Sequence, residues 1–141
     1  MKPFDILEHT ADTGLKIYGK DFQELLEHSA QGLYALMTEV RPETPPGNPC
    51  TAKIQLEASD AGEMLLKWLR EILFYFSTRR FLFLKFQFYT ICETKLSVRA
   101  EGIPFDPKIF DQRVEVKAVT YHQFEICQAA DGWTARVIFD I

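Results

Sequence analysis

Cysteine is scarce in this sequence and is not placed to form the usual cysteine motifs. The chain has three cysteines in 141 residues, Cys50, Cys92 and Cys127, and no Cys-x-x-Cys pair. This odd number and wide spacing give little support to a disulfide framework or a zinc site. We therefore expect a reducing, cytoplasmic environment, with the three cysteines as small buried side chains.

We expect neither a secretory signal peptide nor a segment that crosses a membrane. An acidic residue, Asp5, comes too early for a secretory signal peptide. The most apolar window, residues 72–91, contains Arg79, Arg80 and Lys85, which would be costly at the centre of a bilayer. We expect this window to form core.

Familiar catalytic motifs and an excess of basic charge are missing as well. There is no Walker loop, Rossmann glycine fingerprint, nucleophile elbow or zinc-spaced set of His and Cys residues. The chain carries 16 Lys and Arg against 20 Asp and Glu, a net charge of −4. Tight binding to nucleic acid needs a surplus of cations. We expect no tight, direct nucleic-acid binding, so a role in RNA metabolism would run through a partner.

Aromatic residues, by contrast, are plentiful: twelve Phe, five Tyr and two Trp. They can bury enough apolar surface to offset the entropy lost on ordering the chain, and a chain of this length holds about one core. We predict a single domain over residues 1–141.

The pattern of apolar residues predicts two helices and about eight strands. Asp21 starts a helix that runs to about Thr38, and Asp60 starts a second helix that ends near Arg79. Strands are predicted over residues 4–8, 15–19, 52–58, 81–91, 95–101, 114–121, 123–127 and 133–141. Loops are predicted over residues 40–50 and 102–112. In the strand 81–91, the alternation predicts one shared face for Leu82, Leu84, Phe86 and Phe88.

This order of elements predicts an α+β fold. We expect a two-layer sandwich, with two helices packed on a mainly antiparallel β-sheet. Eight strands are many for one sheet, so a division into two sheets is the alternative.

Acidic residues at strand ends are the main candidates for chemistry. Asp12 lies in the corner between the first two predicted strands, and Asp140 precedes the terminal carboxylate of Ile141. If these strand ends meet, their oxygens suit a hard cation, calcium first and magnesium second. Spacing alone favours the simpler alternative, in which Asp12 is a turn residue and Asp140 a solvated chain end.

Three other polar residues have simple structural explanations. His9 orders the corner beside Asp12 or is an ordinary turn residue. Asp60 suits a helix cap. Lys117 lies in a mostly apolar strand, where period-two alternation turns its side chain outward.

Four stretches together resemble the archease family, in the family's order and spacing and over the whole chain. They are His9–Asp12, Trp68–Leu73, Val116–His122 and Gly132–Ile141. The resemblance implies the archease fold and a small cytoplasmic protein that is not itself an enzyme. It implies that the protein activates an RtcB-type RNA ligase in tRNA splicing and RNA repair, by promoting guanylylation of the ligase and multiple turnover.

The resemblance also implies site residues by position. A divalent-cation site, usually described with calcium, falls on Asp12, Asp140 and Ile141, with magnesium or manganese as alternatives. Functional roles fall on Asp60 and Lys117, and His9 belongs to the first matching motif. The oligomeric state is not implied.

The chain departs from the family's common residues at Ile103 and Phe110, which puts in doubt a role for the loop 102–112 in contacting the ligase.

Two other functions stay open. One is a metal-dependent phosphoester hydrolase, with Asp12 and Asp140 as ligands and His9 as base. The other is a non-catalytic, chaperone-like binding module.

Overall fold

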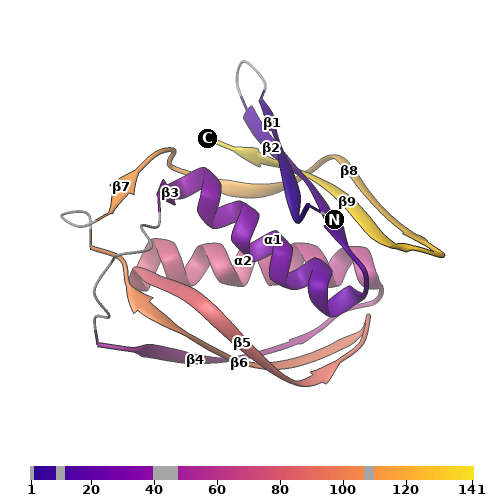
Figure 1. Cartoon of the computed structure of the whole chain (residues 1–141), viewed down its shortest axis with the longest axis horizontal. Helices are drawn as coiled ribbons and strands as arrows, with labels where there is room; N and C mark the ends of the chain where they lie inside the picture. The colour runs from indigo at the N-terminus through magenta and orange to yellow at the C-terminus, as the bar shows by residue number, and fades with distance from the viewer. Residues whose placement is uncertain (1, 9–11, 40–47, 107–109) are drawn as a thin grey trace.

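The structure is a computed structural model that describes residues 2–8, 12–39, 48–106 and 110–141. Over these residues the chain forms two helices and nine strands. The strands make three antiparallel sheets. Figure 1 shows the helices lying between the two larger sheets.

The elements are distributed as follows. The four-stranded sheet has the order β1 (Phe4–Glu8), β2 (Asp12–Gly19), β9 (Gly132–Asp140), β8 (Ala118–Ala129). The three-stranded sheet has the order β4 (Cys50–Glu57), β6 (Lys95–Pro104), β5 (Phe81–Ile91). A short sheet pairs β3 (Thr38–Glu39) with β7 (Asp111–Gln112). The helices are α1 (Phe22–Met37) and α2 (Ala61–Arg79).

Both helices begin where the sequence predicts, at an aspartate N-cap. The Asp21 carboxylate accepts a hydrogen bond from the Glu24 N–H at 2.8 Å, and Asp60 accepts the same bond from the Glu63 N–H at 2.8 Å. These bonds satisfy backbone donors that the first turn of a helix leaves unpaired. Arg80 ends α2 in the left-handed conformation, with φ of 56°.

The helix pair forms the centre of the core because it contacts both larger sheets. On α1, Gly32 lets β2 approach closely: a Cβ at Gly32 would lie 2.9 Å from Cδ1 of Leu15. On α2, the fully buried Trp68 donates from Nε1 to the Leu26 carbonyl of α1 at 2.9 Å. The same indole meets the Phe86 ring of β5 edge-on at a centroid distance of 5.0 Å.

The prediction of two helices packed on antiparallel β-structure is confirmed. The sheet is divided, which was the alternative to one continuous sheet, so the helices have a sheet on each side instead of the single sheet of a two-layer sandwich (Figure 1). The physical reason is that both helices are apolar over more than one face. Such helices need cover on two sides.

Strand β5 breaks the predicted alternation. A register shift lies between Phe83 and Lys85, and the extra residue there, Leu84, is 53% exposed. The prediction that Leu84 shares a face with Phe86 and Phe88 is therefore wrong. A β-bulge inserts one residue and reverses the inward and outward positions that follow it.

The described parts of the predicted loop 102–112, residues 102–106 and 110–112, include strand structure and buried side chains. Strand β6 continues to Pro104, and β7 pairs with β3. Phe105 and Phe110 are both buried, and their rings stack at a centroid distance of 5.6 Å. Burial of these two rings fixes residues 105 and 110 against the core. The prolines and aspartates of this segment do not indicate that burial. Most of the predicted loop 40–50 lies outside the described residues.

Strand β8 replaces two predicted strands. The segments 114–121 and 123–127 join into one strand that starts at Ala118, with a register shift between Thr120 and Glu125. Gln123 lies within this irregularity and has a positive φ of 51°. The chain therefore bends within β8 without leaving the sheet.

The cysteines are only partly as predicted. All three are free thiols, and Cys50 is buried, but Cys92 and Cys127 are exposed. The prediction of burial is wrong for these two because Cys92 lies in the turn after β5 and Cys127 points outward from β8, an edge strand. Neither of the two described helices is long and apolar enough to cross a membrane.

Candidate functional site

The start of β2 and the end of β9 meet at one end of the four-stranded sheet. Strands β2 and β9 pair without a register shift from Gly19 opposite Trp133 to Asp12 opposite Asp140. Asp12 thus belongs to β2 itself, and its predicted position in a corner before the strand is wrong. The pairing of β2 with β9 extends the strand by three residues beyond the alternation seen in the sequence.

Residues directly opposite in an antiparallel pair point to the same face, with Cβ atoms about 4.5–5.5 Å apart. Phe139 is fully buried against the core, so the neighbouring Asp140 and its partner Asp12 point to the face turned away from the helices. Ile141 follows at once and is 40% exposed. The structure therefore brings together the strand ends that carry the predicted oxygen cluster.

One oxygen of this pair has no partner within the described parts of the chain. Asp12 Oδ1 is buried and accepts no hydrogen bond there, whereas Asp140 is exposed. A buried carboxylate oxygen without a donor is costly. Two carboxylates in directly opposite positions also repel each other. Both costs would be relieved by a cation between them.

The donor set fits a hard cation in type. It consists of oxygens alone, as calcium and magnesium prefer, and contains no sulfur or imidazole that would favour a softer metal. No group of three His, Cys, Asp or Glu side chains suited to a metal occurs among the described residues. The third protein oxygen of the predicted set is therefore the main-chain carboxylate of Ile141.

Lys117 lies beside this strand end. Its backbone N–H donates to the Asp140 carbonyl at 2.8 Å, and its side chain is exposed, as predicted. It precedes β8 rather than lying within a strand, because the Arg113 N–H is bonded to the Met37 carbonyl at 2.8 Å. That bond holds the preceding segment near the end of α1, and the chain joins the sheet only at Ala118.

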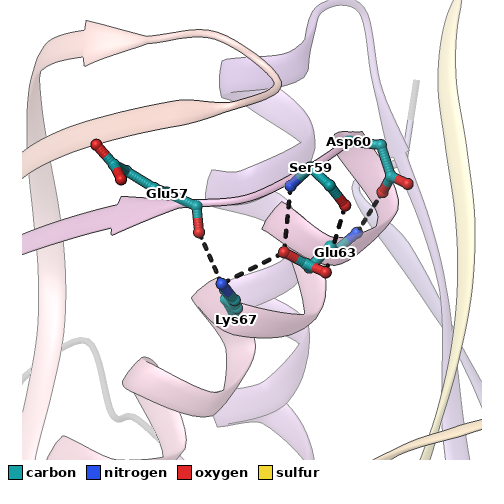
Figure 2. A network of polar contacts seen from close by, with 5 residues as sticks. All are labelled: Glu57, Ser59, Asp60, Glu63 and Lys67. Carbon is teal, nitrogen blue, oxygen red and sulfur yellow. Dashed lines mark hydrogen bonds and ion pairs between the residues drawn. The ribbon is translucent and has the colours of Figure 1, made fainter.

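Asp60 occupies a different place, at the start of α2 (Figure 2). Besides the bond from the Glu63 N–H to Asp60, the Glu63 carboxylate accepts from the Ser59 N–H at 3.1 Å and pairs with the Lys67 ammonium at 3.3 Å. The Lys67 ammonium also donates to the Glu57 carbonyl at 2.8 Å. The Ser59 N–H first, and then Lys67, hold the pKa of the Glu63 carboxyl below its ordinary value.

The two acidic positions are well separated. Asp60 lines a hollow of about 470 Å³ together with Phe124 and Ile126 of β8. Ile126 pairs with Ala135, five residues along β9 from Asp140, which corresponds to about 16 Å at 3.3 Å per residue. Figure 1 likewise shows α2 beginning at the end of the molecule far from the C-terminus. Asp60 is therefore not part of the strand-end cluster.

The hollow also has an aromatic wall, which the sequence pattern does not predict. Tyr121 also lines it, is 63% exposed and carries the Arg70 guanidinium over its ring at 5.1 Å. The irregular part of β8 presents Tyr121 in this way, and alternation alone does not indicate such a bend. The remaining predicted residue, His9, lies outside the described residues.

Comparison with known proteins agrees with this description. The model of the Archease protein family (MTH1598/TM1083) matches residues 4–141. The chain belongs to the archease family. It is 32% identical to Protein archease of Methanosarcina barkeri over 144 residues, covering 99% of this chain and 97% of that protein.

Other archeases match over their full length. Protein archease of Sulfurisphaera tokodaii is 30% identical over 143 residues, with complete coverage of both chains. The solution structure of Methanobacterium thermoautotrophicum protein 1598 superposes with a TM-score of 0.77 at 32% sequence identity, again covering both chains completely. The resemblance to the archease family and to its fold is therefore confirmed.

Proposed function

We propose that this archease activates an RtcB-type RNA ligase in tRNA splicing and RNA repair. In this role the protein promotes guanylylation of the ligase and multiple turnover in the cytoplasm, and catalyses no reaction of its own. Membership of the archease family supports the proposal. The observation that carries it is the buried Oδ1 atom of Asp12, which has no hydrogen-bond partner among the described residues, in a residue directly opposite Asp140 at an outward-facing strand end.

We propose that this strand end holds a divalent cation, calcium first and magnesium or manganese as alternatives. The carboxylates of Asp12 and Asp140 and the terminal carboxylate of Ile141 would be its protein ligands. When bound, the cation supplies a fixed positive charge that can attract phosphate oxygens. Calcium takes six to eight oxygen ligands, so three protein carboxylates leave positions for water or for atoms of a partner.

Lys117 and Asp60 would act in separate ways. Lys117 is bonded to Asp140 through its backbone N–H, and its exposed side chain can pair with an anionic group of the ligase or its nucleotide. Asp60 presents an exposed carboxylate beside the Tyr121 hollow while its Oδ1 atom caps α2. Asp60 therefore belongs to a second contact surface, separated from the first along the length of β9.

A ligation assay with RNA in large excess over ligase tests the strand-end proposal. Wild-type protein should allow many rounds of ligation per ligase, and Asp12→Asn or Asp140→Asn should reduce the reaction to about one round. The matched control is Asp131→Asn, which removes the same charge from an exposed turn at the other end of β9. Full turnover with folded Asp12→Asn and Asp140→Asn proteins would show that the proposal is wrong.

Asp60 allows a sharper test of its own, because asparagine caps a helix as well as aspartate does. Asp60→Asn keeps the cap and removes the charge, so a loss of turnover at unchanged stability would reveal a role in partner contact. Asp21→Asn is the control at the other helix cap. Equal turnover for wild type and Asp60→Asn would show that Asp60 acts only as the N-cap of α2.

A further inference from the structure

The three-stranded sheet has an unusual charge arrangement on the face turned away from the helices. Lys53 of β4 lies directly opposite Arg99 of β6, and both side chains are exposed. Like charges in directly opposite positions destabilise a sheet. The arrangement is also unexpected in a protein with a net charge of −4, because acidic residues are the more numerous.

Neighbouring residues only partly balance these charges. In the next row of the sheet, Lys85 of β5 lies opposite Glu101 of β6. Glu101 also pairs with Arg99 at 3.6 Å. Three cations thus share one acidic residue on this part of the face, and Lys53 forms no ion pair with any residue that the structure describes. At the far end of the sheet, Glu57 and Lys95 lie opposite each other, so their charges balance.

An exposed aromatic side chain lies beside the cations. A second register shift in β5 makes Tyr89 an extra residue, and Tyr89 is 59% exposed. Its hydroxyl donates to Gln87 Oε1 at 3.3 Å, and Gln87 lies opposite Arg99. Tyr89, Lys53 and Arg99 together line a shallow hollow of about 480 Å³. The bulge therefore places an aromatic ring next to the two opposed cations.

We propose that this face binds single-stranded nucleic acid, with phosphates on Lys53, Arg99 and Lys85 and a base stacked on Tyr89. Cations beside an exposed ring are the chemistry that binds single strands without sequence preference. An acidic peptide would use the cations but has no base to stack on Tyr89. The negative charge of the whole protein makes this a weak, salt-sensitive site. The proposal is independent of the strand-end cluster and of any ligase.

Fluorescence anisotropy with the protein alone tests this inference. The probe is a labelled twelve-nucleotide oligouridylate, and oligothymidylate of the same length distinguishes RNA from DNA. Two to three phosphate contacts predict a log–log salt slope of roughly −1.4 to −2.1 between about 50 and 200 mM salt. The double variant Lys53→Gln and Arg99→Gln should flatten the slope by about 1.4. Tyr89→Ala should weaken binding by about fivefold or more without changing the slope.

Matched controls separate this site from general charge. Lys16→Gln combined with Lys20→Gln removes the same charge from exposed positions of another part of the molecule and should leave binding unchanged. Polyglutamate should bind at least tenfold more weakly than the oligonucleotide. The proposal is overturned if the two double variants bind alike, if Tyr89→Ala binds like wild type, or if polyglutamate binds as well as the oligonucleotide. Thermal unfolding confirms that each variant is folded.

Discussion

The aspartates at the helix starts and those at the strand ends differ in their hydrogen-bond contacts. Asp21 and Asp60 each accept a backbone hydrogen bond at 2.8 Å and so complete a helix. Asp12 and Asp140 face each other across two strands, and the buried Oδ1 atom of Asp12 has no donor in the described structure. Contacts within the chain account for the first pair, whereas the contacts of the described residues do not account for the second pair.

This difference shows why an aspartate should be assessed by its contacts and not by its motif alone. The resemblance to the archease family implies a role for Asp60, yet its cap is the same as that of Asp21, for which no role is implied. A role for Asp60 beyond capping must therefore come from its other surroundings, the Tyr121 hollow. Asp12, in contrast, has no contact with the described residues that accounts for its buried oxygen.

The largest expected effect is on stability with and without metal. At a calcium concentration about 100 times its dissociation constant, binding to the native state should stabilise the protein by about 2.7 kcal/mol, or roughly 8 °C in Tm. A chelator should remove this increment, and Asp140→Asn should abolish most of it. Calorimetric melting of both proteins, with calcium and with chelator, measures it.

The same experiment can show that the strand-end aspartates do not differ from the helix-cap aspartates in needing a cation. Without metal, Asp140→Asn should be at least as stable as wild type, because one of two repelling charges is gone. Asp131→Asn should keep the full calcium increment. Equal melting of the wild-type protein in calcium and in chelator would argue that the Asp12 oxygen has no cation partner.

Loss of a helix cap should have the next largest effect. Asp21→Ala and Asp60→Ala should each lower the free energy of unfolding by about 1 kcal/mol, since each leaves a backbone N–H without its acceptor. Asp21→Asn and Asp60→Asn should be nearly neutral. Urea denaturation of the four variants measures this, and a much larger loss for Asp60→Ala than for Asp21→Ala would break the equivalence of the two caps.

A smaller effect is expected where like charges face each other on the other sheet. Lys53→Gln should raise the free energy of unfolding by about 0.5 kcal/mol at low salt, because it removes the repulsion from Arg99. The gain should shrink as salt screens the pair. Urea denaturation at two ionic strengths measures it, with Lys20→Gln as the control. A loss of stability for Lys53→Gln would mean that the opposed cations are not repelling.

The smallest expected effect is on the stability of the fold at acid pH. The pKa of the Glu63 carboxyl is lowered from its ordinary value of 4.5 by the Ser59 N–H and Lys67. A group with a lowered native pKa stabilises the fold above its unfolded pKa, and this contribution is lost as pH falls through the native value. Glu63→Gln should therefore reduce stability at neutral pH but show a shallower loss below pH 4.5. Melting curves from neutral to acid pH measure the difference, which would be absent if the Glu63 contacts were not formed.

Much of the fold can be predicted from local pattern. Asp21 and Asp60 start helices at the predicted residues because a cap and the apolar stripe after it are both local in sequence. Strand β1 and the ends of β5 agree with the prediction for the same reason. The position of Leu84 could not be predicted, because a bulge depends on pairing with the neighbouring strand, β6.

The candidate site divides in the same way. Residue type identified Asp12, Asp140 and Ile141 as an oxygen set, and similarity to the archease family added Asp60 and Lys117. The separation of Asp60 from the strand end could not be predicted, since it depends on how β8 lies along α2. The hollow beside Tyr121 depends on the irregularity near Gln123, which follows from tertiary packing.

The sequence by itself determined where the helices start, that most of the other segments are strands, and that Asp12, Asp140 and Ile141 carry carboxylate oxygens. These features rest on local hydrogen bonds, side-chain periodicity and the chemistry of carboxylates. Only the tertiary structure decided that Asp12 lies opposite Asp140, that Asp60 lies apart from them, and that Lys53 lies opposite Arg99. Strand register sets these neighbours, and register is a property of pairs of distant segments that no single segment contains.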